Sequence, residues 1–502
     1  MEDRVVIAGG GPAGLMLACE LRLMGVDAVV LERTVEPDEN AQGMAVHGRS
    51  LEVFKQRGLA DRIRKEDIWA WPRTPFAFFW LDLDGVGEAD HTYAFPQWRT
   101  ERLLEDRARE LGVDIRRGHE LVGFQQDATG VTVETRSAAG DGQVRGAYLV
   151  GCDGAESRVR DLAGIEFEAG GLTYYGVLGD VVLPDGPQPE FTTGLFQQGM
   201  FGALPLQAGE LRLMTIEFGS AGPDRDTPVT VDELRASIRR VTGTDPRVEG
   251  VRWLSRFGGA TRHAQRYRDG RVLLAGDAAH VLYISGTQGL NAGIQDAVNL
   301  GWKLAAEIQG WAPSGLLDTY HGERHPVGER ICVHARAQMA LMHPLDRVTP
   351  LRGLVAELLE IDAVNRFLLE LPSATGYPLP AADGAEGEPH PLLGQPIPDV
   401  PLDTGGGPAG TAEALHAGRG VLLDLSGGAV DLGDADAWAG RVDVITAEPV
   451  PELDAAVLLV RPDGHVAYAD RTGGSGKGLR PALAAWFGEP ASADAGAVGA
   501  AG

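Results

Sequence analysis

The sequence predicts a mixed α/β protein of several domains, in which an antiparallel sheet interrupts a domain built on parallel strands. Three observations predict this fold class. The chain opens with a strand, a turn, a helix and a second strand; polar and apolar residues alternate from about residue 173; and a short buried strand returns at residue 271. The length of 502 residues also exceeds what one hydrophobic core normally fills.

The first 32 residues have the pattern of a βαβ unit. Residues 4–8 are expected to form a buried strand, residues 9–14 a glycine-rich turn, and residues 13–24 a helix that ends at Gly25. A second apolar run, residues 28–31, ends at Glu32. Because a helical crossover joins the two strands, we expect them to lie parallel in one sheet.

The turn contains Gly9, Gly11 and Gly14 in the spacing G-x-G-x-x-G, with Pro12 and Ala13 between the last two. In this spacing the first glycine permits a tight turn, the second lets a pyrophosphate approach the backbone, and the third lets helix and strand pack closely. The N-terminus of the helix then faces the phosphates. The turn therefore predicts a dinucleotide site, with plain turn chemistry as the alternative.

Glu32 follows the second strand, where its carboxylate can accept hydrogen bonds from both hydroxyls of a ribose. A carboxylate at this place disfavours a 2′-phosphate, which leaves FAD and NAD as the candidate cofactors. A solvated charge at a strand end is the alternative interpretation of Glu32. The neighbouring Arg33 can cover an adenine with its guanidinium plane.

Composition excludes several other classes of function. The formal net charge of −26 repels phosphate backbones and anionic lipid, so we expect no nucleic-acid or membrane partner. Cys19, Cys152 and Cys332 lie far apart, which argues for structural thiols and against a redox pair or a disulfide framework. The 12 histidines show no metal-ligand spacing, so we expect no metal site. The charged start of the chain predicts a cytoplasmic protein without a signal peptide.

Changes in composition and in hydrophobic pattern along the chain predict the domain limits. The segment 372–401 is dense in proline and glycine, and short apolar strands follow it near residues 421, 442 and 456. Residues 290–308 carry a helical apolar stripe, which indicates that the first domain resumes there. We expect a discontinuous first domain at 1–172 and 260–371, a middle antiparallel domain at 173–259, a linker at 372–401, a third domain at 402–490 and a disordered tail at 491–502.

Three further segments carry a resemblance to a known family. Residues 148–160 contain Asp153-Gly154, residues 271–300 contain Gly276-Asp277, and residues 96–104 begin with Pro96-Gln97. In this order they resemble the motifs of flavoprotein monooxygenases of the p-hydroxybenzoate hydroxylase class. The C-terminal part, with a Pro-Leu-Leu-Gly segment at 391–394 and a strand–turn–strand pattern around residue 463, is similar to the thioredoxin-like tail of the aromatic polyketide hydroxylases.

The resemblance implies an FAD-binding Rossmann-like domain of the GR2 type, an inserted substrate domain and a thioredoxin-like C-terminal domain. This tail has no redox cysteines, which favours a packing or dimer-associated role for it. By resemblance, FAD is held by the glycine turn together with Gln42, Gln97, Asp153, Gly276, Asp277, Gly289, Leu290 and Asn291. Arg49 is a further candidate contact, and relatives often carry an arginine where this chain has Asn40.

The helix that begins near Leu290 aims backbone N–H groups at a flat ring, which stabilises negative charge on a reduced flavin. Asp277 can accept hydrogen bonds from ribityl hydroxyls, with a turn or helix cap as the alternative. Asp153 is assigned a supporting role, with an ordinary turn followed by an ion pair as the alternative. Where many relatives carry two prolines beside the flavin, this chain has residues 281–285 without proline. That departure leaves the regiochemistry open.

The substrate chamber is expected between the flavin ring and the middle sheet. A flat polycyclic ligand would contact apolar and aromatic side chains there, and the alternative is that these side chains form an ordinary core. The candidates are Phe196, Phe201, Leu204 and Met214 on the sheet side and Tyr283 and Ile284 on the flavin side.

The resemblance implies reduction of FAD by NADPH or NADH, reaction with O2, and transfer of one oxygen atom to a polycyclic aromatic, polyketide-type substrate through a flavin C4a-hydroperoxide. No catalytic side chain can be named from the sequence. A Baeyer–Villiger or ring-opening monooxygenase on the same fold is the alternative, and a flavin-containing drug-binding protein is a more remote one. The sequence also leaves open whether the chain is a homodimer.

Overall fold

The structure is a computed structural model that describes residues 3–37, 43–182, 192–206, 210–220, 222–223, 227–246, 248, 250–283, 288–373, 376–377, 379, 388–472 and 478–490. Gln42, Ile284 and the tail at 491–502 lie outside the described residues. Within the described part, no helix is long and apolar enough to cross a membrane.

A six-stranded sheet opens the fold, and its strands are parallel except at one edge, where β18 and β19 are antiparallel. The predicted βαβ unit is confirmed, because β1 and β2 pair in parallel and are joined by helix α1 (Pro12–Leu23). The strands in spatial order are β18 (Arg268–Asp269), β19 (Val272–Leu274), β12 (Tyr148–Gly151), β1 (Val5–Ala8), β2 (Ala28–Glu32) and β8 (Asp114–Arg117).

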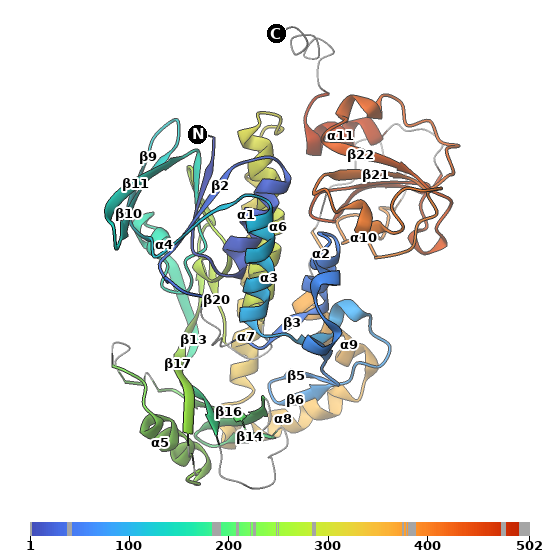
Figure 1. Ribbon diagram of the computed structural model, residues 1–502. Coiled ribbons are helices and arrows are strands. Elements are labelled where there is room, and N and C mark those ends of the chain that lie inside the picture. The colour runs from blue at the N-terminus through green and yellow to red at the C-terminus, as the bar shows by residue number, and fades with distance from the viewer. Residues whose placement is uncertain are drawn as a thin grey trace.

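One hydrophobic core joins this sheet to the helices beside it. Helix α1 and the longer α6 (Gln288–Ile308) pack against each other, and α3 (Gln97–Glu110) lies along them (Figure 1). The strand residues Val5, Val6 and Ile7 and the helix residues Leu15 and Ile294 are fully buried in this core. The three cysteines are free, and Cys19 and Cys332 are buried, as expected for structural thiols.

The second large sheet has six antiparallel strands and extends below the first domain in Figure 1. Its two longest strands, β13 and β17, run from the first sheet into the middle of the molecule, with register shifts between Gly170 and Tyr174 and between Asp180 and Val181. They cross the limits expected at 172/173 and 259/260, and the division at those points stays a prediction. The strands in spatial order are β14 (Thr192–Phe196), β15 (Gly199–Pro205), β16 (Glu210–Phe218), β13 (Phe167–Val182), β17 (Gly250–Ala264) and β20 (His280–Val281).

Shorter elements complete these two parts. Helix α5 (Val231–Thr242) covers one face of the second sheet, and α7 (Thr319–Ala340) follows α6. The remaining strands are β9 (Glu120–Gln126), β10 (Val131–Ser137) and β11 (Gly140–Gly146) in one small sheet, β3 (Ala45–His47), β7 (Thr92–Ala94) and β4 (Trp69–Ala70) in another, and the hairpin β5 (Thr74–Phe76) and β6 (Phe79–Leu81). The remaining helices are α2 (Gly48–Lys55), α4 (Arg158–Leu162), α8 (Leu345–Leu359) and α9 (Asp362–Ser373).

The C-terminal part is a separate mixed sheet with its own hydrophobic clusters, drawn in red in Figure 1. The four strands expected from the sequence are present in the order β22 (Val442–Thr446), β21 (Gly420–Asp424), β23 (Val457–Val460) and β24 (Val466–Asp470), with α10 (Thr411–Ala414) and α11 (Leu479–Phe487). Strands β21 and β22 are parallel, and the other two pairs are antiparallel.

Arg57 joins the C-terminal part to the first domain. Its buried guanidinium forms a double ion pair with Glu20 of α1, with nitrogen–oxygen distances of 2.7 and 2.9 Å. The same guanidinium donates to the carbonyl oxygens of Leu415 and Pro462 at 3.1 and 2.6 Å. One side chain therefore satisfies a buried carboxylate and two backbone groups of another domain.

We expect Arg57→Met to lower the free energy of unfolding by about 3–5 kcal/mol, because it leaves the Glu20 charge buried without a partner. The matched control is Arg62→Met, whose ion pair with Glu110 is exposed and should contribute only about 0–1 kcal/mol. Urea unfolding followed by circular dichroism measures both. Equal shifts for the two variants would contradict this account of Arg57.

Candidate active site

The glycine turn has the geometry that a bound pyrophosphate requires. Gly9 has a φ of +104°, and a Cβ on Gly9 would lie 2.2 Å from the Cys152 carbonyl oxygen. A Cβ on Gly14 would lie 2.1 Å from the Gly9 carbonyl oxygen, so this glycine lets α1 pack onto the turn. A Cβ on Gly11 would meet no atom within 4 Å. Gly11 thus leaves open space where a ligand can approach the backbone, and Pro12 begins the helix.

Glu32 lies directly beside this turn. One carboxylate oxygen accepts a hydrogen bond from the Gly10 N–H at 2.7 Å, and the other accepts from the N–H and hydroxyl of Thr34 at 2.8 and 2.7 Å. The carboxylate is therefore held beside the glycine turn, and its contact with a ribose stays a prediction. Arg33 is exposed and lines the adjoining cavity.

The second motif meets the first through Ala13. The Ala13 Cβ lies 3.1 and 3.3 Å from the Cβ positions built on Gly276 and Gly293, so larger residues would force the turn and α6 apart. Asp277 follows Gly276 in a short 3-10 turn and faces the cavity, close to Gly289 at the start of α6. Protein surrounds its remaining sides, and this desolvation raises the pKa of Asp277.

Gln288, Gly289 and Leu290, in the first turn of α6, line the same cavity. Asn291 is placed differently, because its buried side-chain oxygen accepts hydrogen bonds from the His47 N–H at 2.8 Å and the Ser50 hydroxyl at 2.6 Å. That contact anchors α2 to α6. Asn291 is among the residues expected to bind the cofactor, but its side-chain oxygen is occupied by hydrogen bonds within the protein.

Asp153 and Gln97 each form hydrogen bonds within the protein and also line the cavity. Asp153 caps α4 by accepting from the Ser157 hydroxyl at 2.5 Å and the Val159 N–H at 3.0 Å, while burial raises the pKa of Asp153. Gln97 donates to Glu101 at 2.8 Å. Both Asp153 and Gln97 line the cavity. Arg49 is buried and pairs with Glu52 at 2.6 Å, and it is not among the lining residues.

A cavity of about 970 Å³ joins Asp153, Asp277 and the start of α6 to the second sheet. Its far wall is apolar and aromatic, which suits a flat hydrophobic ligand. Six of the side chains on that wall are Trp71, Phe78, Tyr174, Met200, Met214 and Phe257. Arg212 also lines it, held by two hydrogen bonds to Asp180 at 2.7 and 2.8 Å.

Side chains on β16 divide between the two faces of the sheet. On β16, Met214, Ile216 and Phe218 share a cluster with Tyr283, while Leu211 and Leu213 pack with α5 on the opposite face. On β15, Met200 and Leu204 line the cavity, whereas Phe201 packs in the α5 cluster.

The structure thus places the expected substrate residues Leu204, Met214 and Tyr283 at the cavity and does not place Phe196 or Phe201 there. For Phe201 the reason is strand alternation, because successive side chains on a strand point to opposite faces. Phe196 is the last residue of β14, at the edge of the sheet, and its ring lies over Gly194.

Tyr283 is buried within an aromatic cluster at the cavity wall. Its ring meets Tyr174 edge-on with centroids 5.0 Å apart, and its hydroxyl contacts the Met200 sulfur at 3.1 Å. Burial raises the pKa of Tyr283, so the phenol stays neutral. Contact between Tyr283 and a substrate stays a prediction.

Residues 71–80 form a further part of the cavity wall that the sequence did not predict. Trp71, Pro75, Phe78 and Trp80 all line the cavity. The composition was informative, since residues 69–80 contain three tryptophans and three phenylalanines. Short strands with such a composition typically pack against something apolar, but their position over the cavity depends on tertiary contacts.

Comparison with known proteins supports the same interpretation of the site. Residues 2–335 match the family described as FAD binding domain, and residues 390–490 match the family described as aromatic-ring hydroxylase, C-terminal. The chain belongs to the FAD-dependent aromatic-ring hydroxylases. Within this hydroxylase family, the residues present fit an FAD, because the open space at Gly11 beside Glu32 would admit a pyrophosphate, and Asp277 and the start of α6 line the cavity where a ring could lie.

Three similar proteins span the whole hydroxylase chain. A 12-dehydrotetracycline 5-monooxygenase/anhydrotetracycline 6-monooxygenase of Streptomyces rimosus is 44% identical, with 98% of this chain and 100% of the relative covered. A dialkyldecalin synthase of Streptomyces rugosporus has the same identity and coverage. The solved structure of an anhydrotetracycline hydroxylase from Streptomyces rimosus superposes with a TM-score of 0.89 at 42% identity, covering 98% of this chain and 100% of that one.

The open space at Gly11 predicts different outcomes for two alanine substitutions. Gly11→Ala should leave the apo-protein as stable as the parent but weaken FAD binding, because the methyl group occupies the place of the pyrophosphate. Gly14→Ala should destabilise the apo-protein itself, because its Cβ would collide with the Gly9 carbonyl. Thermal unfolding without FAD and fluorescence titration with FAD separate the two effects. Equal loss of apo-protein stability in both variants would contradict the assignment of Gly11.

Proposed function

We propose that this hydroxylase is an FAD-dependent monooxygenase that transfers one oxygen atom from O2 to a planar polycyclic aromatic substrate of the polyketide type, with NADPH or NADH as reductant. The observation that carries the proposal is the shared cavity, which has Asp277 and the start of α6 at one end and an apolar wall at the other. Bound FAD would accept electrons from the nicotinamide and activate O2.

The chain's own residues supply position, charge and exclusion of water. The N–H groups in the first turn of α6 face the cavity and stabilise negative charge there. The aromatic wall around Tyr174 and Phe257 excludes water from a bound substrate and orients its flat face. Arg212 reaches this wall as an ion pair with Asp180, which neutralises its charge there.

Three other functions are alternatives. A Baeyer–Villiger or ring-opening monooxygenase would use the same cavity and cofactor. The similarity to a dialkyldecalin synthase makes an enzyme that forms carbon–carbon bonds a second alternative. A flavin-containing protein that only binds its ligand is the third.

Turnover with isotopic oxygen distinguishes these functions. We expect tetracyclic aromatic polyketides to stimulate oxidation of NADPH or NADH by the holoenzyme and to gain one 18O atom from 18O2. A hydroxyl on an intact ring supports aromatic hydroxylation, and an inserted ester oxygen identifies the Baeyer–Villiger alternative. A product of unchanged mass supports bond formation, and tight binding without any product would leave only the binding protein.

Strand alternation predicts which substitutions change substrate use. Met214→Trp should raise the substrate KM at least about tenfold, equivalent to about 1.4 kcal/mol, because the larger ring enters the cavity. The control is Leu213→Met, a volume-conserving change on the α5 face, which should leave KM unchanged. Steady-state kinetics with any accepted substrate measures both. Parental KM in the Met214 variant would place the substrate elsewhere.

A further inference from the structure

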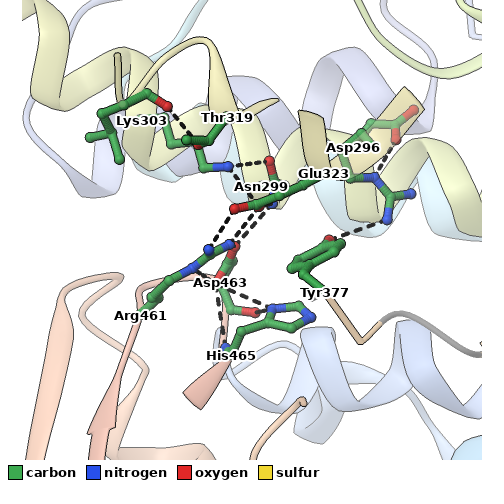
Figure 2. Close-up of polar contacts among 11 residues, drawn as sticks. Asp296, Asn299, Lys303, Thr319, Glu323, Tyr377, Arg461, Asp463 and His465 are labelled. Atoms are coloured by element: carbon green, nitrogen blue, oxygen red, sulfur yellow. Dashed lines mark hydrogen bonds and ion pairs between the residues drawn. The ribbon is translucent and has the colours of Figure 1, made fainter. Parts of the chain in front are cut away.

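Buried charges connect α6 and α7 of the FAD domain with the C-terminal domain (Figure 2). Asp296, Asn299 and Lys303 come from α6, and Glu323 and Arg324 come from α7. Arg461, Asp463 and His465 come from the turn between β23 and β24, and Tyr377 comes from the segment between the domains. Positive and negative side chains are equal in number, since Lys303, Arg324 and Arg461 balance Asp296, Glu323 and Asp463.

Asp296 lies at the end of this set that is nearest the cavity. One of its carboxylate oxygens accepts from the Gly276 N–H at 3.0 Å and from His280 Nε2 at 2.7 Å, so it holds both ends of the turn that carries Asp277. The other oxygen accepts from Arg324 Nε at 2.7 Å. Burial opposes the charged form, but Arg324 and His280 outweigh it and lower the pKa of Asp296 to about 2. The carboxylate is therefore charged.

Arg324 links Asp296 to the rest of the set. Besides Asp296, its guanidinium donates to the Tyr377 hydroxyl at 3.2 Å and to the Ala292 carbonyl at 3.3 Å. A planar guanidinium with partners on several sides has one orientation only. Loss of one partner leaves a buried donor unsatisfied, so the group would shift toward another acceptor.

Tyr377 lies at one of the contacts between the two domains. Its ring stacks on the His465 ring with centroids 4.3 Å apart, and the Arg461 guanidinium lies 5.5 Å from its centroid. Its backbone N–H donates to the Gly394 carbonyl, while the Gly394 N–H donates to the Val466 carbonyl of β24, both at 2.8 Å. The C-terminal domain thus determines where the Tyr377 hydroxyl lies.

Arg461 fixes that domain against α7. It donates twice to Glu323, at 2.7 and 2.8 Å, and also pairs with Asp463. Lys303 donates to the same Glu323 at 2.7 Å and to Asn299 at 2.9 Å (Figure 2). Ion pairs with fixed geometry therefore join the two domains here, beside the aromatic packing of Trp302 on Trp486 and Phe487.

We propose that Tyr377 and His465 are positioning residues for FAD binding: through Arg324 and Asp296 they hold the Gly276–His280 turn, and with it Asp277, at the cavity. This gives the C-terminal domain, which contains none of the three cysteines, a role in preparing the cofactor site. The inference rests on the FAD site and does not depend on which reaction the enzyme performs.

Tyr377→Phe tests this role, because it removes the hydroxyl and keeps the ring. We expect the FAD dissociation constant of the apo-protein to rise about 2- to 30-fold, the range found for residues that act through such networks. Amide exchange of a peptide that covers residues 272–283 should also become faster before FAD is added. The control is Tyr468→Phe. Tyr468 is a buried tyrosine of the C-terminal domain that lies outside this set of charges, so its substitution should change neither the FAD dissociation constant nor the amide exchange.

Arg324→Lys provides a second variant, because lysine keeps the charge beside Asp296 but lacks the planar fork that reaches Asp296, Tyr377 and Ala292 together. This variant should also raise the FAD dissociation constant, and it tests the proposal on its own if Tyr377→Phe does not fold. Parental FAD affinity and parental exchange in the variant that folds would overturn the proposal. An equal effect of Tyr468→Phe would also overturn it, because the cause would then be general destabilisation. Neither readout requires a substrate or turnover.

Discussion

The close contact of Ala13 with Gly276 and Gly293 is the constraint on which the rest of the structure depends. Ala13 is more than 260 residues away from Gly276 and Gly293 along the chain. A closer approach by a few tenths of an ångström at this contact would produce a steric clash. This contact sets the distance between α1 and α6, and therefore between the crevice beside Gly11 and the cavity that Asp277 faces. Five of the six strands of the antiparallel sheet lie between these two motifs in the chain, so the folding of that sheet must return the chain to this point.

Much of this arrangement could be predicted from local sequence. The strand before Gly9, the helix after it and the carboxylate of Glu32 follow from hydrophobic pattern and turn chemistry, and the structure contains each of them. The four C-terminal strands were likewise visible as apolar runs. These features depend on contacts between residues that are near one another in the chain.

What could not be predicted depends on register and on distant partners. Phe201 and Met200 are neighbours of similar character, yet only Met200 reaches the cavity, and nothing in the sequence states which face of β15 is covered by α5. The side chain of Asn291 is engaged by His47 and Ser50, which are more than 240 residues away. The segment around Trp71 reaches the cavity wall through tertiary packing alone.

The alternation of faces in the second sheet has a consequence for how such enzymes diversify. Residues that stabilise the sheet, such as Leu211 and Leu213, are different residues from those that meet the ligand, such as Met214, although they are adjacent in the chain. A mutation at an inward position can therefore reshape the binding surface at little cost to folding. A fold organised in this way can acquire new substrates by single steps, each of which leaves a stable protein for the next step to alter.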